Sequence, residues 1–209
     1  MKIKTITAII LCFAALAGCK HQDQPANIAK QHATNQQDQR SQKIAALTDM
    51  QQNQAAQQYA RTFLGKKAPS FSFADQNGNI HSLQSFKGKK VLLEFASTAC
   101  PTCQHVHPVL SRWTKKQKQI HWIQVFPIEP KASVERFLKR THDESQHLVL
   151  MMSGHPDATS PDRLIEQYQI DYVPTFLFID ESGKIQMTYI GNVDEATLDH
   201  LNRLAFQEK

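Results

Sequence analysis

The sequence has little of what a nucleic-acid-binding protein needs. Its formal net charge is only +5 over 209 residues, and the lysines are scattered along the chain rather than gathered into one stripe. Aromatic residues do not alternate with basic ones, as they do on surfaces that stack bases and neutralise phosphates. We therefore expect solvated surface lysines and no nucleic acid among the partners.

The N-terminal apolar run is too short for a permanent membrane span. Lys2 and Lys4 precede the uncharged stretch Ile6–Gly18, which has 13 residues. As a helix this stretch would be roughly 20 Å long, whereas the hydrocarbon core of a bilayer is about 30 Å thick. A short positive region followed by an apolar region of this length predicts a leader peptide that is removed on export.

The leader ends in Leu16-Ala17-Gly18-Cys19, which resembles the lipoprotein box of bacteria. The resemblance implies that residues 1–18 are a lipoprotein signal peptide and that the Cys19 thiol takes a diacylglyceryl group. An ordinary secretory leader that happens to contain a cysteine is the alternative. Lys20 follows, and a residue other than aspartate there implies the outer membrane in Gram-negative lipoproteins. We therefore expect a periplasmic protein held by a lipid anchor, at the outer rather than the inner membrane.

The sequence is also poor in cysteine, with four in all. Cys12 would leave with the leader and Cys19 would carry the lipid. The mature protein would then keep two free thiols, Cys100 and Cys103. Outside the cytoplasm, two nearby cysteines can form and keep a disulfide, so any thiol chemistry of the mature protein is expected from this pair.

Large apolar residues are almost absent between Lys20 and about Arg61. Twelve glutamines lie between Gln22 and Gln58, and no glycine does. Such a composition cannot bury enough surface to offset the entropy of ordering the chain. Residues 19–62 are therefore predicted to be a tether that holds the domain off the membrane. Sparse apolar residues in its second half could form a marginal helix, but their spacing is too irregular for a coiled coil.

The rest of the chain, residues 63–209, is predicted to form one α/β domain. The expected strands are Ser70–Ala74, Asn79–Ser82, Val91–Ala96, Ile120–Phe126, His147–Met152, Thr175–Asp180 and Lys184–Ile190, and the expected helices are Ser133–Thr141, Asp162–Tyr168 and Glu195–Leu204. Asn77-Gly78 predicts an N-terminal β-hairpin. The alternation of strands and helices predicts a mixed β-sheet with helices on both faces.

Cys100-Pro101-Thr102-Cys103 follows the buried run Val91–Ala96 after a short loop and is predicted to begin a helix. Two cysteines three positions apart at a helix start lie on one face and can close into a small disulfide ring. Unpaired backbone N–H groups and the positive end of the helix dipole favour a thiolate at Cys100. That thiolate would attack a partner's disulfide, and Cys103 would resolve the mixed disulfide. Pro101 removes one N–H and helps to fix the turn.

Two other uses of this motif stay open. A purely structural disulfide would close a loop of four residues and stabilise the fold by only about 2 kcal/mol, which makes it a poor cross-link. A metal half-site is the other, in which Cys100 and Cys103, with or without His107, hold a cuprous ion. His105 and His107 cannot both turn toward the cysteines, because they lie roughly 200° apart around a helix. The sequence has no second Cys-x-x-Cys motif to complete a tetrahedral zinc site.

Several segments in chain order resemble the thioredoxin superfamily, and within it the membrane-tethered TlpA/ResA-like thiol-disulfide oxidoreductases. The matching segments are Gly65–Phe71, Asn77-Gly78, Leu83, Lys87–Lys89, Phe95–Cys103, Pro108, Val173–Thr175 and Tyr189–Gly191. The resemblance covers Gly65–Leu204 and implies a thioredoxin-like fold. It also implies that Pro108 is the proline that kinks the active-site helix.

The resemblance further implies a substrate-binding loop. Val173-Pro174 is similar to the family's cis-proline loop, and an X–Pro bond is the one place where cis costs little. A proline has no N–H, so beside the active disulfide it leaves neighbouring backbone groups free to dock an extended substrate. Val173 would then pair with a peptide partner in the manner of a β-strand. Val173, Pro174, Pro101 and Thr102 are expected to bind substrate, although an ordinary proline at a strand start is the alternative.

Glu94 is the only charged residue in Val91–Ala96. It falls where thioredoxins keep a buried acid beneath the second cysteine, and the resemblance assigns it the proton transfer for Cys103. A carboxyl in apolar surroundings has a raised pKa and can accept or return a proton near neutral pH. An edge position that faces water is the alternative.

The expected function is disulfide exchange with extracytoplasmic proteins, with no cofactor or resident metal. The resemblance to TlpA-like proteins implies the direction of reduction and a membrane thiol as the electron donor. Ala99 replaces the tryptophan usual before the first cysteine, so partner docking or redox tuning is expected to differ. A copper metallochaperone and, less favoured, a thiol peroxidase are the alternatives. Neither cysteine lies in a Pro-x-x-x-Thr-x-x-Cys arrangement. The remaining histidines weighed as ligands are predicted to be surface or loop residues: His121, His142, His147 and His155.

Overall fold

A computed structural model describes residues 53–141 and 147–206 of the chain. The predicted leader, Cys19, His142 and most of the predicted tether lie outside these residues. Among the described residues, no helix is both long enough and apolar enough to cross a membrane.

The described residues alternate between strands and helices. The strands are β1 (Ser72–Ala74), β2 (Ile80–Ser82), β3 (Lys90–Phe95), β4 (Ile120–Phe126), β5 (Leu148–Met151), β6 (Thr175–Ile179) and β7 (Ile185–Ile190). The helices are the 3-10 turn η1 (Leu83–Phe86), α2 (Pro101–Lys116), α3 (Lys131–Arg140), α4 (Pro161–Tyr168) and α5 (Glu195–Phe206), and residues 53–63 are helical as well.

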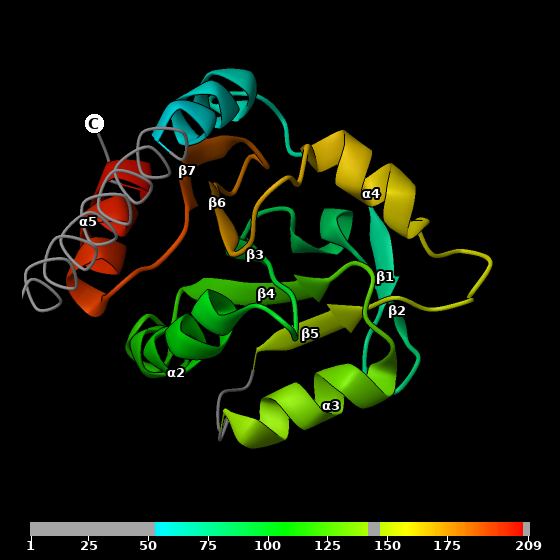
Figure 1. The fold of residues 1–209 in the computed structure, drawn as a ribbon. Coiled ribbons are helices and arrows are strands. Elements are labelled where there is room, and N and C mark those ends of the chain that lie inside the picture. Colours follow the sequence, from blue (N-terminus) through cyan, green and yellow to red (C-terminus); the bar gives the residue numbers. More distant parts are fainter. Residues whose placement is uncertain (1–52, 142–146, 207–209) are drawn as a thin grey trace, which may run out of the picture. The chain divides into compact units, whose positions relative to one another are not determined.

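The seven strands form one mixed sheet in the order β2-β1-β5-β4-β3-β6-β7 (Figure 1). β3 runs parallel to β4, and β4 runs parallel to β5. β6 pairs with β3 in the antiparallel direction, so the last residues of β3 lie beside the first residues of β6. At the far edge, β1 and β2 pair antiparallel where the sequence predicts a hairpin. The predicted mixed sheet is confirmed.

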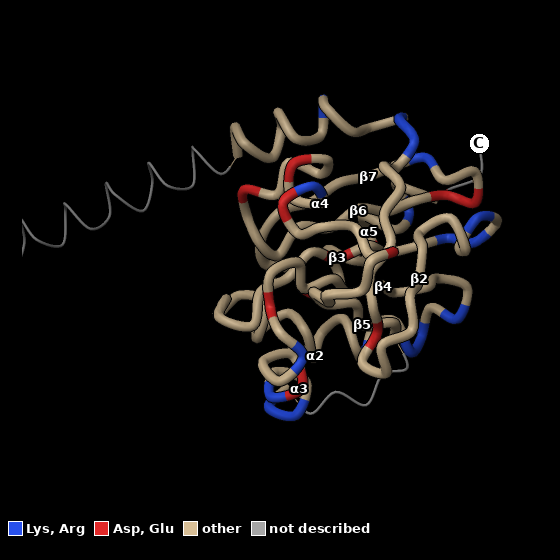
Figure 2. The backbone as a smooth tube through the Cα atoms, turned by 90° about the vertical axis from the view of Figure 1, so that its right-hand side faces the viewer, with Lys and Arg blue, Asp and Glu red and all other residues tan. Residues whose placement is uncertain are grey.

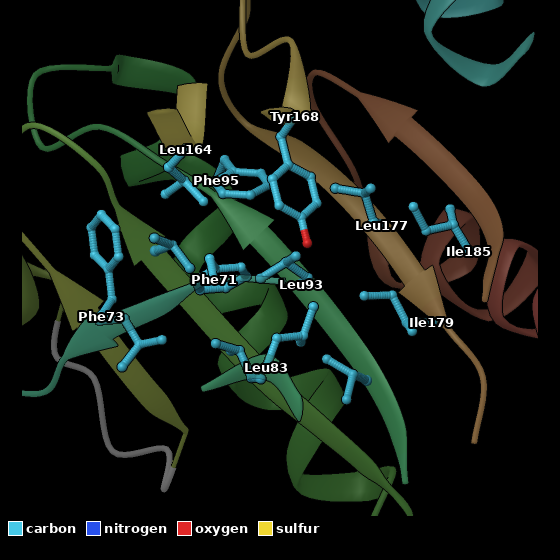
Figure 3. Packing of buried hydrophobic residues seen from close by; sticks show 14 of the residues in the cluster. Phe71, Phe73, Leu83, Leu93, Phe95, Leu164, Tyr168, Leu177, Ile179 and Ile185 are labelled. Carbon is cyan, nitrogen blue, oxygen red and sulfur yellow. The ribbon is translucent and has the colours of Figure 1, made fainter. Parts of the chain in front are cut away.

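The central strand β3 sends its side chains into separate cores on the two faces of the sheet. Leu93 and Phe95 pack in one cluster with Tyr168 of α4, and the ring centroids of Phe95 and Tyr168 are 4.8 Å apart (Figure 3). Leu92 packs in the other cluster with Val106 of α2 and with residues of α5. Helices therefore cover both faces of the sheet, as predicted.

The helix at residues 53–63 joins the first of these cores. Tyr59 is 7% exposed and Phe63 5% exposed, and their ring centroids are 4.7 Å apart. The Phe63 ring also stacks on Tyr168 at 6.3 Å. Tyr59 thus lies in the core four residues before the start of the domain that composition predicts, because two aromatic residues in a polar stretch suffice to dock one helix.

The basic residues of the described chain lie in several separate segments (Figure 2). Some are paired: Lys116 Nζ lies 2.6 Å from Glu195 Oε2, which links α2 to α5. Both side chains are exposed to solvent, which screens the pair, so it contributes little to the stability of the fold.

Candidate active site

Cys100 and Cys103 lie where the loop after β3 enters α2. Cys100 is the N-cap residue of α2, and its Sγ accepts a hydrogen bond from the backbone N–H of Cys103 at 3.1 Å. Pro101 occupies the first turn, where a missing N–H leaves no intrahelical bond unmade. A donor aimed at Cys100 Sγ stabilises negative charge on that sulfur.

The two thiols differ in access to solvent. Cys100 is half-buried, whereas the Cys103 side chain is fully buried. Burial raises the pKa of the Cys103 thiol well above its usual range, and its hydrogen bond to Cys100 and the charge of Glu94 raise it further. The geometry thus favours Cys100 as the attacking sulfur and leaves Cys103 protonated until a base receives its proton.

The Val173–Pro174 loop lies against the first cysteine. The peptide bond between Val173 and Pro174 is cis, and the Cys100 thiol donates to the Val173 carbonyl oxygen at 3.5 Å. Pro174 is buried, while Pro101 is exposed and Thr102 half-buried at the start of α2. The residues expected to bind substrate are therefore brought to one edge of the sheet, at the end of β3 and the start of β6.

The loop before Cys100 is held at Thr98 from two sides. The Thr98 N–H donates to Glu129 Oε1 at 2.9 Å. The Thr98 carbonyl accepts from Gln104 Nε2 at 3.1 Å and from Arg140 Nη2 at 3.4 Å. Glu129, 8% exposed, was missed from the sequence. It follows β4, whose parallel pairing with β3 brings its end to the edge where Cys100 lies, and that placement could have found it.

Glu94 is fully buried in β3, so the water-facing alternative does not hold. Its Oε2 accepts a hydrogen bond from Trp122 Nε1 at 3.0 Å, while its Oε1 is buried without a hydrogen-bond partner. Burial raises the pKa of the Glu94 carboxyl to about 8, and the neighbouring Trp122 and Gln124 side chains lower it by less. A carboxyl with this pKa can take up or release a proton near neutral pH.

A layer of polar side chains beneath α2 was not foreseen. Gln124 and His107 are fully buried, and Gln124 Nε2 lies 3.1 Å from His107 Nδ1. His147 Nε2 lies 3.1 Å from Gln124 Oε1. His147 lies in the loop directly before β5, and its half-buried ring stacks on Trp122. Residues on α2, β4 and the start of β5 meet here only because the two strands are parallel neighbours.

The copper-site alternative concerns Cys100, Cys103 and His107, which all lie in the described part of the chain. Across residues 53–141 and 147–206, no group of three or more His, Cys, Asp and Glu side chains could hold a metal ion. His107, the residue considered as a third copper ligand, has its Nδ1 engaged by Gln124 and its ring 5.1 Å from that of Phe137. The arrangement suits proton and thiol chemistry.

Known proteins share this fold and this region of sequence. The Redoxin family matches residues 63–203. The thiol-disulfide oxidoreductase ResA of Geobacillus kaustophilus is 26% identical over 144 residues, which cover 68% of this chain and 78% of the relative. The thioredoxin-like protein YneN of Bacillus subtilis is 27% identical and covers 65% of this chain and 76% of its own.

Solved structures agree on the architecture. A thiol:disulfide interchange protein of the thioredoxin family from Chlorobium tepidum superposes with a TM-score of 0.53 at 25% identity, covering 68% of this chain and 96% of its own. StoA from Bacillus subtilis superposes with a TM-score of 0.52 at 21% identity, covering 65% and 97%. The predicted thioredoxin-like fold is confirmed.

Proposed function

The chain belongs to the Redoxin family, and on that premise we propose that it exchanges disulfides with extracytoplasmic protein substrates through Cys100 and Cys103, in the direction of reduction. Its fold and its relatives are those of thiol-disulfide oxidoreductases. One observation carries the assignment of roles. Cys100 is partly open to solvent and caps a helix, while Cys103 is buried next to the acid Glu94.

The reaction begins at Cys100. Its thiolate attacks one sulfur of the partner's disulfide, the partner's S–S bond breaks, and the departing sulfur leaves as a thiolate that takes a proton from solvent. Cys100 is then joined to the partner's other sulfur. Val173 lies beside Cys100 Sγ, which supports pairing of its backbone with the partner's chain.

The second step releases the partner. Cys103 gives its proton to Glu94, and the resulting thiolate attacks Cys100 Sγ. The mixed disulfide breaks, the Cys100–Cys103 disulfide forms, and the partner's second sulfur leaves as a thiolate that takes a proton from solvent, while Glu94 returns its proton to solvent. Two electrons have passed to the partner, and a membrane thiol donor would restore the dithiol by the reverse exchange.

The placement outside the cytoplasm rests on the leader and on the lipoprotein-like box at Cys19. Lipid attachment at Cys19 would anchor the protein to a membrane, with the outer membrane favoured by Lys20. Residues 19–62 would then span part of the distance between the lipid and the domain. A protein held in this way meets partners in the periplasm, where disulfides persist.

The test is a reduction potential combined with an insulin reduction assay on the mature chain. A potential near roughly −270 mV marks a reductant, and one near about −120 mV marks an oxidant. We expect a value close to the first, insulin reduction by the wild type, and none by Cys100→Ser. The exposed neighbour His105 offers a matched control, since His105→Ala changes α2 beside the site and should retain the rate. A potential near the oxidising value would overturn the direction, and an active Cys100→Ser would overturn the role of the thiol.

A further inference from the structure

The two oxygens of Glu94 are treated differently by their surroundings. Oε2 accepts from Trp122 Nε1 at 3.0 Å, whereas Oε1 has no hydrogen-bond partner although it is buried. An indole N–H donates and cannot accept. Oε2 therefore stays an acceptor whether the carboxyl is charged or neutral, and Oε1 carries the proton when the carboxyl is neutral.

Trp122 is itself held by two histidine rings. The His147 ring lies face to face with it, with the ring centroids 3.8 Å apart and 13° between the planes. The His107 ring approaches at 5.2 Å with an angle of 50°. The indole of Trp122 is thus fixed by a residue of α2 and by the residue directly before β5. Trp122 itself lies on β4, whereas Glu94 lies on β3.

Gln124 ties these two histidines together. Its Nε2 lies 3.1 Å from His107 Nδ1, and its Oε1 lies 3.1 Å from His147 Nε2. An amide nitrogen donates and an amide oxygen accepts, so the two contacts are satisfied when His107 Nδ1 accepts and His147 Nε2 donates. Gln124 is also the register partner of Glu94 across β3 and β4, and its side chain lowers the pKa of the Glu94 carboxyl directly, as Trp122 does. The set therefore forms one connected polar layer under the active-site helix.

We propose that Trp122 is a positioning residue that holds Glu94 by Oε2, so that Oε1 alone exchanges the proton with Cys103, and that His147, His107 and Gln124 keep the indole in place. The proposal rests on the proposed function, because it assumes that Glu94 handles this proton. It adds which oxygen does so and which residues determine its proton affinity.

Among the groups packed around Glu94, this polar layer is the main influence on the proton affinity of the carboxyl. From α2, the titratable side chains are Cys103 and His107, and His147 comes from the start of β5. β4 contributes Trp122 and Gln124, and β6 faces Glu94 with the apolar Phe176. Neither β4 nor β6 places a titratable side chain opposite Glu94 in register. Loss of the indole N–H should therefore act on the carboxyl directly.

The experiment follows the carboxyl carbon of Glu94 by NMR with labelled glutamate, as a function of pH, in the oxidised protein. Trp122→Phe keeps a buried ring and removes the N–H that stabilises the charged form. In this variant the pH midpoint of the Glu94 carboxyl should rise above that of the wild type by about one pH unit, roughly a tenfold gain in proton affinity. The midpoint of the insulin reduction rate against pH should move in the same direction.

The chain provides a matched control in its other tryptophan. Trp113 is also buried and donates its Nε1 to a carboxylate, Asp199 Oδ1 at 2.8 Å, at the other end of α2. Trp113→Phe should destabilise the fold to a similar degree and leave the Glu94 midpoint where it is. Equal shifts in the two variants would assign the effect to general loosening and overturn the proposal.

A second variant keeps the test decisive if Trp122→Phe does not fold. His147→Ala removes the stacked ring and should raise the pH midpoint of Glu94 by a smaller amount; an unmoved midpoint counts against the proposal.

Glu94→Gln separates the proton role of Glu94 from the positioning role of Trp122. If its turnover equals that of the wild type, the proton role of Glu94 fails and the proposal fails with it. If Glu94→Gln is slow but Trp122→Phe does not shift the midpoint, only the positioning role is overturned.

Discussion

The sulfur of Cys100 lies 3.5 Å from the carbonyl oxygen of Val173, a residue 73 positions later in the chain. The two meet because β3 and β6 pair antiparallel, with Phe95 opposite Thr175. A partner disulfide that reaches this sulfur would therefore lie near the backbone of Val173. The sulfur that we propose to attack and the backbone that we propose to bind the partner thus lie side by side.

The difference in burial between the cysteines predicts which variant traps partners. Cys103→Ser should accumulate mixed disulfides, because Cys100 can still attack but nothing resolves the product. Cys100→Ser should accumulate none, since the remaining thiol is fully buried. Non-reducing gels of cell extracts, followed by mass spectrometry of the adducts, measure both. Adducts on Cys103 in the Cys100→Ser variant would reverse the assigned roles.

Removal of Glu94 should lower activity, but it should raise stability only when the hydrogen-bond donor Trp122 is replaced as well. Glu94→Leu removes the unpartnered Oε1 and at the same time leaves the buried Trp122 N–H without an acceptor. We expect little net change in the free energy of unfolding at pH 7. The wild type has the unpaired Oε1 and the variant has the unpaired indole N–H, and each such buried group costs about 1–3 kcal/mol. The double variant Glu94→Leu/Trp122→Phe should be more stable than Glu94→Leu, by about 2 kcal/mol.

Chemical denaturation of the four proteins of this cycle gives the coupling between Glu94 and Trp122. Turnover should fall in both variants that lack the carboxyl, because Cys103 would lose the proton acceptor that we propose for it. A wild-type rate in Glu94→Leu would contradict the role of Glu94, whatever the stability does.

The pKa of Glu94 also predicts how stability depends on pH. The carboxyl has its pKa raised from 4.5 to about 8 in the folded protein. The folded chain therefore binds this proton more tightly than the unfolded chain, and the resulting stability is fully present below about pH 4.5. It is lost as the pH rises through 8, at up to about 1.4 kcal/mol per pH unit.

Glu94→Gln provides the comparison, since glutamine keeps the shape and does not titrate. The difference in unfolding free energy between wild type and Glu94→Gln, measured from pH 4.5 to 9, should change by about 4 kcal/mol in favour of the variant. Because other ionisable groups are common to both proteins, their effects cancel. A difference that stays constant over this range would show that the carboxyl is not buried as described.

The helix at residues 53–63 predicts a large effect at one position and a small one beside it. Phe63 packs in the core against Tyr59 and Tyr168, so Phe63→Ala should lower the free energy of unfolding by about 3–5 kcal/mol. Leu64 is 42% exposed, and Leu64→Ala should change it by less than about 1 kcal/mol. Urea denaturation of both variants measures the contrast. Equally small effects of the two variants would indicate that this helix belongs to the tether and does not pack in the core.

Cys19 predicts the state of the membrane anchor. Wild-type protein should take up radiolabelled palmitate and sediment with membranes, whereas Cys19→Ala should do neither, because the thiol that accepts the lipid is gone. Cys12→Ala is the matched control and should keep the label, since Cys12 is expected to leave with the leader. A wild-type chain without label would remove the lipoprotein hypothesis and leave an ordinary secretory leader.

The strands and helices of the domain could be predicted from the sequence with good bounds, because their patterns are local. The expected strand Ile120–Phe126 matches β4 residue for residue, and the expected helix Asp162–Tyr168 begins one residue after Pro161, the first residue of α4. The burial of Glu94 could be predicted as well, since a strand that is apolar at every other position is expected to be buried on both faces.

The polar layer around Trp122 could not be found in the same way. Its members come from α2, β4 and the start of β5, and no local pattern says that they meet. Gln124 joins Glu94 only through the parallel register of β3 and β4. His147 stacks on Trp122 for the same reason. Contacts of this kind depend on which strands are neighbours, and the sequence reports that order only indirectly.

The three hydrogen bonds at Thr98 have a consequence for how tightly partners bind. Because Glu129, Gln104 and Arg140 already hold the Thr98 backbone in the free protein, the segment just before Cys100 is ordered before any partner arrives. Ordering a backbone costs about 1–2 kcal/mol per residue. A partner that docks at Cys100 does not meet that cost a second time, and a larger part of its contact energy appears as affinity.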